Sequence, residues 1–231
     1  MLAQWEAEQY EMAKLVSEVD GKEYSEIRWI GGVDISFDPR DPDRICAYLT
    51  VMDLQHSSNP PVYENYLVDR VTVPYQSGFL GFREVPFYIH LLMELKRNHP
   101  EYYPDVVLVD GFGKLHHRGI GSASHLGVKM DIPTIGVAKT LLSIDGLQEH
   151  QIKSDFKTHC HGARSHLILK GQSGQTYGVA FKSTDSVQNP IYISVGHKIS
   201  LGMAIKVVAT LCNYRVPEPI RNSDIKSKLH F

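Results

Sequence analysis

The sequence has few cysteines, and they are far apart. Cys46, Cys160 and Cys212 are the three cysteines among 231 residues. An odd number at this spacing does not suit a disulfide framework and is typical of proteins from a reducing compartment. This composition argues against a small secreted fold held by disulfides, and it leads us to expect an intracellular protein.

Long apolar runs are also missing. No stretch approaches the roughly 18 uninterrupted apolar residues that a membrane-spanning helix needs. Residues 1–16 are acidic and lack the apolar core of a signal peptide. Internal repeats, low-complexity tracts and an obvious linker are absent as well. We therefore expect one domain over residues 1–231, with no membrane partner.

Positive charge is not in excess. The chain has 24 Lys and Arg against 26 Asp and Glu, which gives a formal net charge of −2. No global field therefore attracts a nucleic acid, and a nucleic-acid partner would have to be recognised by a local site. Carboxylates in an active site would themselves lower the net charge. With 42% apolar residues, the chain can still form a sizeable core.

The first half of the sequence predicts a helix followed by three strands. Residues 2–19 have helical spacing and end at a Gly turn. Short, turn-rich links join the three strands, which suggests an antiparallel meander. The helix would bury Leu2, Trp5, Met12, Leu15 and Val16. The strands are expected at 27–37, 45–53 and 62–73.

After the meander, helices and strands alternate. The short apolar runs 106–109 and 132–137 are typical of buried parallel strands. Residues 143–165 are polar, and we expect a long irregular loop there. The pattern as a whole predicts a mixed α/β sheet flanked by helices. The further helices are expected at 87–95, 122–129, 199–212 and 220–229, and the further strands at 167–169, 176–181 and 191–195.

Three acidic residues stand at unusual places next to apolar segments. Asp34 lies inside the strand pattern of residues 30–37, where an unpaired carboxylate is costly to bury. Asp110 follows 106–109, at the carboxyl end of a parallel strand, where open α/β sheets bind ligands. Glu84 lies where the chain enters the next helix. We expect the three carboxylates to meet at one edge of the sheet.

Such a set of carboxylates can hold divalent cations. Mg²⁺ takes oxygen ligands, and Mn²⁺ accepts the same donors. Two bridged cations would activate a water and stabilise the leaving oxygen of a phosphodiester. Each acid also has an ordinary structural explanation. Asp34 could pair with a buried Arg or Lys, Glu84 could be a first-turn helix acid, and Asp110 could belong to a turn.

The loop after Asp110 carries glycines and basic residues. It could offer backbone donors and cations to a phosphate, although its spacing matches neither a Walker A motif nor a dinucleotide fingerprint. His116 and His117 are adjacent and would point in opposite directions, so they would not bind one metal together. Lys139 could face a phosphate or could be a solvated lysine.

Two further motifs have both a functional and a structural explanation. Tyr75 could stack on a base, worth ~1–3 kcal/mol, or could be a core tyrosine with a tethered hydroxyl. The His159-Cys160-His161 run matches no ordinary zinc-finger spacing, so we expect a surface loop.

Five runs of sequence together resemble the endonuclease V family. They occur in family order, at family-like separations, and the resemblance covers about residues 27 to 228. The runs are Gly32-Val33-Asp34-Ile35-Ser36-Phe37, Pro74-Tyr75-Gln76-Ser77-Gly78-Phe79-Leu80-Gly81-Phe82-Arg83-Glu84, Val109-Asp110-Gly111-Phe112-Gly113-Lys114-Leu115-His116-His117-Arg118-Gly119, Gly136-Val137-Ala138-Lys139 and Pro217-Glu218-Pro219-Ile220-Arg221.

The resemblance implies a ribonuclease H-like fold and a metal-dependent active site. Mg²⁺, with Mn²⁺ as a substitute, would be held by Asp34, Glu84, Asp110 and Asp224. Bacterial members often have His at the position of Asp224. Lys139 and His116 match positions that family members place near the scissile phosphate. Nucleic-acid contacts are implied for Pro74, Tyr75, Gln76 and Ser77, which form the family's wedge, while Arg118 lies in the basic loop; Gly78, Gly81, Gly111 and Gly113 are our candidates for pocket backbone.

Where Gln76 and Ser77 stand, many relatives have an apolar residue or Pro, so we expect some wedge contacts to differ in this chain. The implied reaction is hydrolysis of the second phosphodiester 3′ to inosine, leaving a 3′-hydroxyl and a 5′-phosphate. The His-His-Arg-Gly form resembles animal members, which favour RNA. We therefore predict an inosine-specific endoribonuclease acting on single-stranded or mismatched RNA, in the cytoplasm or nucleus, including the nucleolus.

Other functions stay open at this point. The chain could be a deoxyinosine-specific DNA repair endonuclease, or another ribonuclease H-like nuclease such as a junction resolvase. It could also be a non-catalytic module that binds inosine-containing nucleic acid, although the complete set of acids argues against that. A metabolic phosphohydrolase is compatible with the charge but is not favoured by the motifs. The sequence indicates no protein partner.

Overall fold

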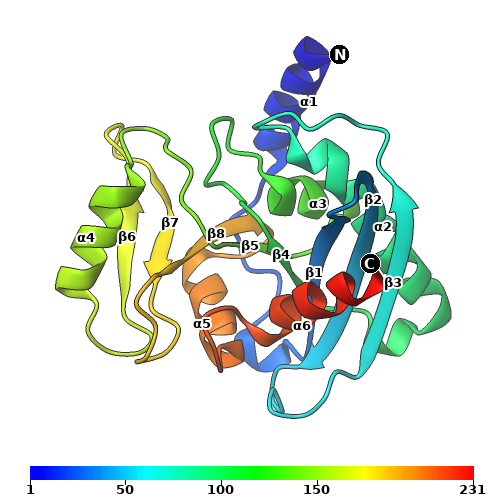
Figure 1. The fold of residues 1–231 in the computed structure, drawn as a ribbon. Helices are drawn as coiled ribbons and strands as arrows, with labels where there is room; N and C mark the ends of the chain where they lie inside the picture. Colours follow the sequence, from blue (N-terminus) through cyan, green and yellow to red (C-terminus); the bar gives the residue numbers. More distant parts are fainter.

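The computed structural model describes residues 1–231 and contains one eight-stranded sheet (Figure 1). The strand order is β3-β2-β1-β4-β5-β8-β7-β6. The parallel pairs are β1 with β4 and β4 with β5, and all other neighbours are antiparallel. The strands are β1 (Trp29–Asp38), β2 (Asp41–Asp53), β3 (Tyr63–Arg70), β4 (Val106–Asp110), β5 (Thr134–Ala138), β6 (His166–Lys170), β7 (Thr176–Phe181) and β8 (Ile191–His197).

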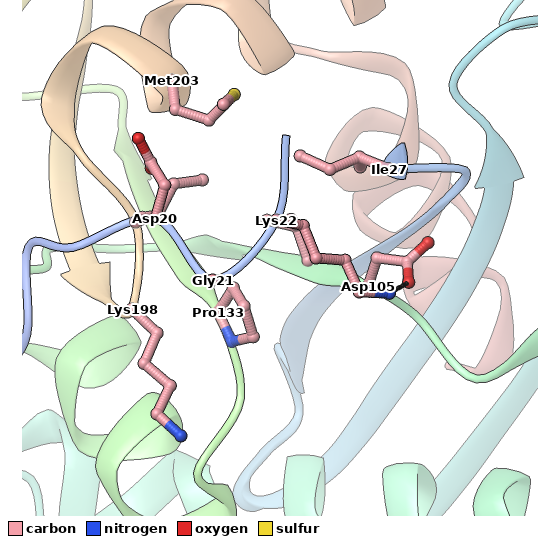
Figure 2. A pocket seen from close by; sticks show the side chains of 10 residues that line it. Asp20, Gly21, Lys22, Ile27, Asp105, Pro133, Lys198 and Met203 are labelled. Carbon is pink, nitrogen blue, oxygen red and sulfur yellow. Dashed lines mark hydrogen bonds and ion pairs between the residues drawn. The ribbon is translucent and has the colours of Figure 1, made fainter. Parts of the chain in front are cut away.

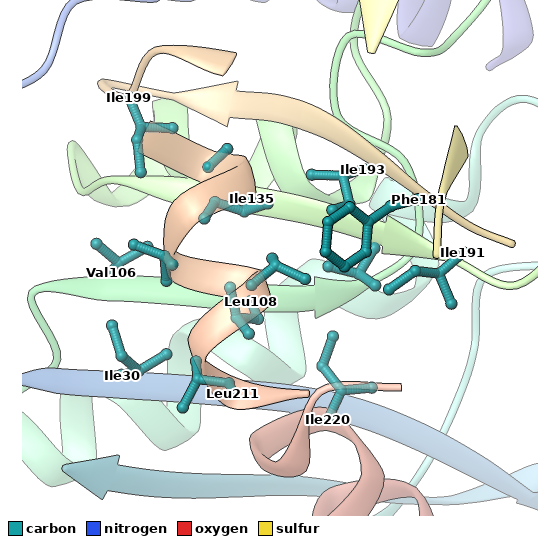
Figure 3. Packing of buried hydrophobic residues seen from close by; sticks show 14 of the residues in the cluster. Ile30, Val106, Leu108, Ile135, Phe181, Ile191, Ile193, Ile199, Leu211 and Ile220 are labelled. Carbon is teal, nitrogen blue, oxygen red and sulfur yellow. The ribbon is translucent and has the colours of Figure 1, made fainter. Parts of the chain in front are cut away.

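Helices cover both faces of the central strands. The alternation of side chains along β4 sends Val106 and Leu108 to one apolar cluster and Val107 and Val109 to another. In Figure 3, α5 packs across the first of these clusters. The mixed α/β sheet predicted from the sequence is therefore confirmed. The helices are α1 (Leu2–Leu15), α2 (Leu80–Asn98), α3 (Ser122–Met130), α4 (Glu149–His159), α5 (Leu201–Leu211) and α6 (Glu218–Ser227), with 3-10 turns at Tyr24–Glu26, Pro100–Tyr102 and Lys228–His230.

Three local predictions were wrong. Residues 143–165 contain α4, whose helical pattern rests on only two buried side chains, Ile152 and Phe156, one turn apart. Helix α2 begins at Leu80, well before the predicted start, and includes Pro86. In α1, Leu2 and Leu15 are exposed while a glutamine on the same helix is buried. None of the helices is long and apolar enough to span a membrane.

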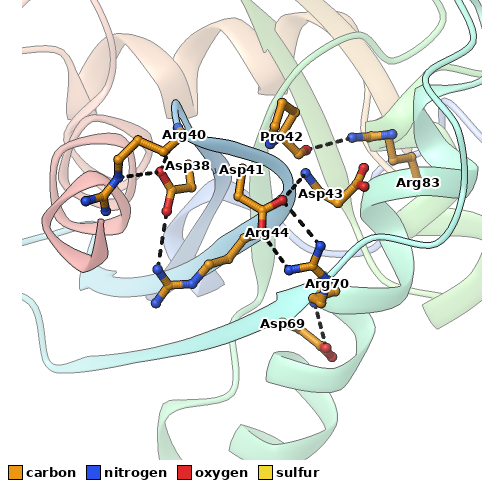
Figure 4. Close-up of polar contacts among 9 residues, drawn as sticks. All are labelled: Asp38, Arg40, Asp41, Pro42, Asp43, Arg44, Asp69, Arg70 and Arg83. Carbon is orange, nitrogen blue, oxygen red and sulfur yellow. Dashed lines mark hydrogen bonds and ion pairs between the residues drawn. The ribbon is translucent and has the colours of Figure 1, made fainter.

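Charged side chains fix the start of α2 against the β1–β2 hairpin (Figure 4). Arg83 donates to the carbonyls of Val73, at 2.7 Å, and Pro42, at 3.4 Å. Nearby, Asp38 pairs with Arg40 and Arg44. Because Glu84 directly follows Arg83, these contacts also fix where the Glu84 side chain leaves the helix.

A small hollow lined by charged residues lies at the amino end of β4 (Figure 2). Its charges already have partners within the protein. Asp105 pairs with Lys22 and accepts the backbone N–H groups of Arg28 and Trp29, while Asp20 accepts from Ser200. These acids therefore hold the N-terminal segment in place.

Candidate active site

Three of the predicted acidic residues line one cavity at the carboxyl end of β4. Val33 and Val109 are paired in the parallel β1–β4 register, so Asp34 and Asp110 stand side by side. Alternation turns both carboxylates toward the face that α6 covers, and α6 contributes Asp224. The predicted meeting of Asp34 and Asp110 at one sheet edge is confirmed.

Two lysines in this cavity pair with some of its acids but not with all. The Lys139 Nζ donates to Asp110 Oδ2 at 2.6 Å and to Asp224 Oδ2 at 3.4 Å. Lys228 Nζ lies 2.6 Å from Asp224 Oδ1. Asp34 is 7% exposed and lies in no ion pair, so the alternative that it pairs with a buried Arg or Lys does not hold.

Burial makes these carboxylates hard to ionise. Burial raises the pKa of Asp34 well above its ordinary value, and the charges of Asp110 and Asp224 raise it further, against Lys139. Burial likewise raises the pKa of Asp110. At Asp224, burial is outweighed by the hydrogen bond from Lys228, and the pKa is lowered. More negative charge is therefore gathered at this edge than the two lysines compensate.

Glu84 approaches the same edge from the other face, because α2 packs opposite α6. Ser122 Oγ donates to Glu84 Oε2 at 3.1 Å. Burial raises the pKa of Glu84 to about 7, opposed by the Ser122 hydrogen bond. Glu84 lines a second cavity, and Asp110 lines both. The Asp110 side chain therefore stands where the two cavities meet.

The donor set fits a hard divalent cation in its chemistry. All four candidates are carboxylates, Asp34 lacks a cationic partner, and burial disfavours its charge unless a cation compensates it. The four acids come from both faces of the sheet, and no three His, Cys, Asp or Glu side chains are packed closely enough to form a preassembled cage. The acids supply ligands without enclosing an ion by themselves.

The high pKa of Glu84 leads to a prediction about stability. The folded protein holds a proton on Glu84 up to about pH 7, whereas an unfolded glutamate loses it near its ordinary value of 4.5. The free energy of unfolding of the metal-free protein, measured in EDTA, should therefore fall as pH rises from 4.5 to about 7. We expect Glu84→Gln to raise the unfolding free energy by about 1–3 kcal/mol at pH 8 and to have little effect at pH 4. Thermal unfolding at both pH values measures this, and no gain at pH 8 would contradict it.

The second cavity, about 210 Å³ in volume, opens beneath the loop that contains Tyr75. The Tyr75 side chain is 68% exposed, so the alternative of a core tyrosine is wrong. Pro74, Gln76 and Ser77 are exposed beside it. An exposed aromatic ring at the mouth of a cavity is well placed to stack on a nucleic-acid base.

The candidate pocket glycines divide into two groups. Gly78, Gly81 and Gly111 line the second cavity. Gly113 does not, because it packs against β8, where an added Cβ would lie 2.0 Å from the Val195 carbonyl oxygen. Its N–H donates to Ser194 Oγ. We therefore correct the prediction for Gly113: this glycine is required by backbone packing rather than by a ligand.

His116 and Arg118 face the second cavity and the loop that contains Tyr75. They do not face the first cavity, lined by Asp34, Asp110 and Asp224, which we call the acidic cavity. His116 is buried, and burial lowers its pKa to about 4, so it is neutral at pH 7. It lines the second cavity, whereas Lys139 lines the acidic one. The guanidinium of Arg118 bonds to Gly78 and stacks on Phe79 at 4.3 Å. These contacts hold the loop, and a phosphate contact of either residue stays a prediction.

The His159-Cys160-His161 run does not form a surface loop throughout. His159 ends α4, and Cys160 is buried in a cluster beneath it that also contains Phe156. His161 is exposed. No zinc site is indicated by the surrounding residues.

Comparison with known proteins agrees with this arrangement. The family model described as Endonuclease V matches residues 10–225. The chain belongs to the endonuclease V family. Human Endonuclease V is 43% identical over 207 residues, covering 90% of this chain and 73% of the relative; mouse Endonuclease V is 41% identical, covering 98% and 68%.

Solved endonuclease V structures share the fold. The catalytic domain of human Endonuclease V superposes with a TM-score of 0.95 at 40% identity, covering 99% of this chain and 95% of that one. Ciona intestinalis Endonuclease V, solved with a 23mer DNA containing an inosine followed by a ribo-adenosine, gives a TM-score of 0.92 at 31% identity, covering 99% and 96%. The ribonuclease H-like fold of endonuclease V is therefore confirmed for this chain, which is a nuclease by family.

Several residues at this endonuclease V site were not predicted from the sequence. Lys228 pairs with Asp224, Ser122 bonds Glu84, and Gln9 on α1 reaches the loop beside the second cavity. Each is an ordinary polar residue on a helix, and its role depends on contacts with distant segments. A glutamine at position 9, on the expected apolar side of α1 between Trp5 and Met12, was the one available signal.

Proposed function

We propose that the protein is a metal-dependent endonuclease that recognises inosine in single-stranded RNA. It hydrolyses the second phosphodiester on the 3′ side of inosine and leaves a 3′-hydroxyl and a 5′-phosphate. The observation that carries this proposal is the connection of the two cavities through Asp110. One cavity has the size and the exposed aromatic lip of a base pocket, and the other gathers carboxylates and lysines.

The side chains divide the work between binding and chemistry. Tyr75 stacks on a base and supports extrusion of inosine, which costs a few kcal/mol and least in single strands. Asp34, Glu84, Asp110 and Asp224 would hold Mg²⁺ or Mn²⁺, which when bound supplies the positive charge for water activation and for the leaving oxygen. Lys139, already within reach of two of these acids, offers its ammonium to the phosphate.

The relatives support a nucleic-acid substrate with inosine. Two Ciona intestinalis Endonuclease V structures contain DNA with an inosine followed by a ribo-adenosine. A ribonucleotide beside the inosine is compatible with reading of a 2′-hydroxyl, the group by which proteins distinguish RNA from DNA. The DNA in the same complexes favours a second candidate, a deoxyinosine-specific DNA repair endonuclease.

Competition between substrates tests the choice. Wild-type protein would be given equal amounts of labelled inosine RNA, inosine DNA and branched DNA in one reaction with Mg²⁺. We expect inosine RNA to be consumed first. Preferred cutting of inosine DNA would support the repair enzyme, and preferred cutting of branched DNA would support a resolvase.

The exposed Tyr75 ring gives a separate prediction. Tyr75→Ala removes the stacking surface but leaves the carboxylates unchanged, so we expect Kd for inosine RNA to rise roughly 5- to 150-fold, matching ~1–3 kcal/mol of stacking. Tyr75→Phe keeps the ring and serves as the matched control. Fluorescence anisotropy with EDTA measures both variants. Equal affinity of Tyr75→Ala and wild type would exclude the wedge role.

A further inference from the structure

One backbone carbonyl beside the second cavity, called the base cavity from here on, accepts hydrogen bonds from three side chains. The oxygen of Gly78 lies 2.9 Å from Gln9 Nε2, 2.8 Å from Arg118 Nη2 and 3.1 Å from His116 Nε2. Gly78 directly follows the exposed wedge residues, has a φ of +79° and lines the cavity. Three donors on one oxygen fix the point at which residues 74–78, called the base-reading loop below, lead into α2.

The donor assigned to His116 follows from its other nitrogen. The backbone N–H of Arg118 donates to His116 Nδ1 at 3.3 Å, so Nδ1 is the acceptor. Burial lowers the pKa of His116 to about 4, which keeps the ring neutral. The single ring proton is then on Nε2, and it points at the Gly78 oxygen.

Gln9 is the member of this group that comes from a distant part of the chain. It lies on α1, is 1% exposed and sits 69 residues before Gly78 in the chain. Its Oε1 accepts from Arg118 Nε, and its Nε2 donates to the Gly78 carbonyl and, at 3.5 Å, to the Ile120 carbonyl. Both ends of the buried amide are therefore satisfied, by a loop and by the side chain that stacks on that loop.

Helix α1 packs on α3 and also contacts the start of α2 and the Arg118 side chain. Trp5 stacks on Phe82 with ring centroids 4.9 Å apart and lies 5.9 Å from Phe79. Glu6 lies 3.9 Å from Arg118. Neither Gln9 nor Trp5 lines the acidic cavity. Helix α1 is thus placed against the base-reading loop and away from the carboxylates.

We propose that α1 holds the base-reading loop in place and that Gln9 is the positioning residue for this loop. Through the loop, Gln9 sets the preference for inosine over adenosine without touching the reacting groups. The inference rests on the proposed function, because it assigns Gln9 to the pocket in which inosine is read. Rigid backbone around a base pocket discriminates by hydrogen-bond geometry, and a loop free to shift would accept either base.

Two substitutions distinguish the hydrogen bond accepted by Gln9 Oε1 from those donated by Gln9 Nε2. Gln9→Glu keeps an oxygen for Arg118 but places a second oxygen, instead of a donor, against the Gly78 carbonyl. Gln9→Leu removes all three hydrogen bonds of the amide, to Gly78, Ile120 and Arg118. Gln4→Leu is the matched control, since Gln4 is exposed on the same helix and bonds only Glu8. Thermal unfolding shows that each variant is folded.

The readout is kinetics on matched inosine and adenosine RNA with Mg²⁺. For both Gln9 variants we expect KM for inosine RNA to rise at least tenfold and the inosine-to-adenosine ratio of kcat/KM to fall at least tenfold. We expect kcat on inosine RNA to stay within threefold, and Gln4→Leu to match wild type.

Other outcomes are decisive as well. A folded Gln9→Glu protein with wild-type KM and wild-type preference would overturn the inference, and so would a fall in kcat alone. If wild-type protein itself shows no preference for inosine, the proposed function fails instead, and the two failures are thereby told apart.

Discussion

We expect the largest effect from Asp34→Asn and Asp110→Asn. Each should reduce cleavage of inosine RNA by at least roughly 1,000-fold while Kd for the RNA changes less than about threefold. Both side chains line the acidic cavity, and Asp110 also stands where this cavity meets the base cavity. Asparagine keeps the shape but removes the charge that would bind a divalent cation and activate water. Single-turnover cleavage and anisotropy in EDTA measure the two effects.

The control for these variants is Asp43→Asn. Asp43 is exposed on the β1–β2 hairpin, and its side chain forms no ion pair. We expect wild-type cleavage from it. Because burial raises the pKa of Asp34 and Asp110, neither active-site substitution should destabilise the metal-free protein. Retained cleavage in either folded variant, with Mg²⁺ present, would remove that residue from the metal site.

Gly32→Ala is expected to damage both stability and activity. A Cβ on Gly32 would lie 2.3 Å from the backbone carbon of Pro219 and 2.6 Å from its oxygen, so α6 has to move away from β1. The same helix donates from Ser223 Oγ to the Gly32 carbonyl at 3.0 Å and carries Asp224. We expect unfolding to become easier by about 2–4 kcal/mol and cleavage to fall roughly 100-fold.

The neighbouring glycine provides the comparison. A Cβ on Gly31 points to the other face and meets only side-chain atoms of Val107 and Pro104, at 3.2–3.3 Å. Gly31→Ala should therefore cost less than half as much stability and keep most of the cleavage. Denaturant unfolding and cleavage assays on the pair decide the point. Equal behaviour of the two variants would mean that α6 is not packed on β1 as described.

The parts of the fold that the sequence predicts are those with strong local signals. The β1–β2–β3 meander is set by turn-rich links, and β4 and β5 consist almost entirely of apolar residues. The place of β8 between β5 and β7 depends on pairing between distant segments, which no local pattern encodes. Helix α4 was missed because its polar surface hides a narrow apolar stripe.

The site divides in the same way. Asp34 and Asp110 could be recognised because a carboxylate next to an apolar strand requires compensation. The parallel register then brings them together. Gly113 was misplaced because glycines required by packing and glycines that line a pocket look alike in a sequence. The partners of Gly78 could not be predicted, since they come from α1 and from the loop after β4.

The most direct test of the proposed activity is to map the cut in matched single-stranded oligonucleotides. RNA and DNA strands with inosine or adenosine at one position would be incubated with Mg²⁺ or with EDTA, and the product ends would be sequenced. We predict one cut in inosine RNA, at the second phosphodiester 3′ to inosine, with a 5′-phosphate and with no product in EDTA. No cutting of any strand by folded protein with metal would contradict the assignment and would indicate a binding module.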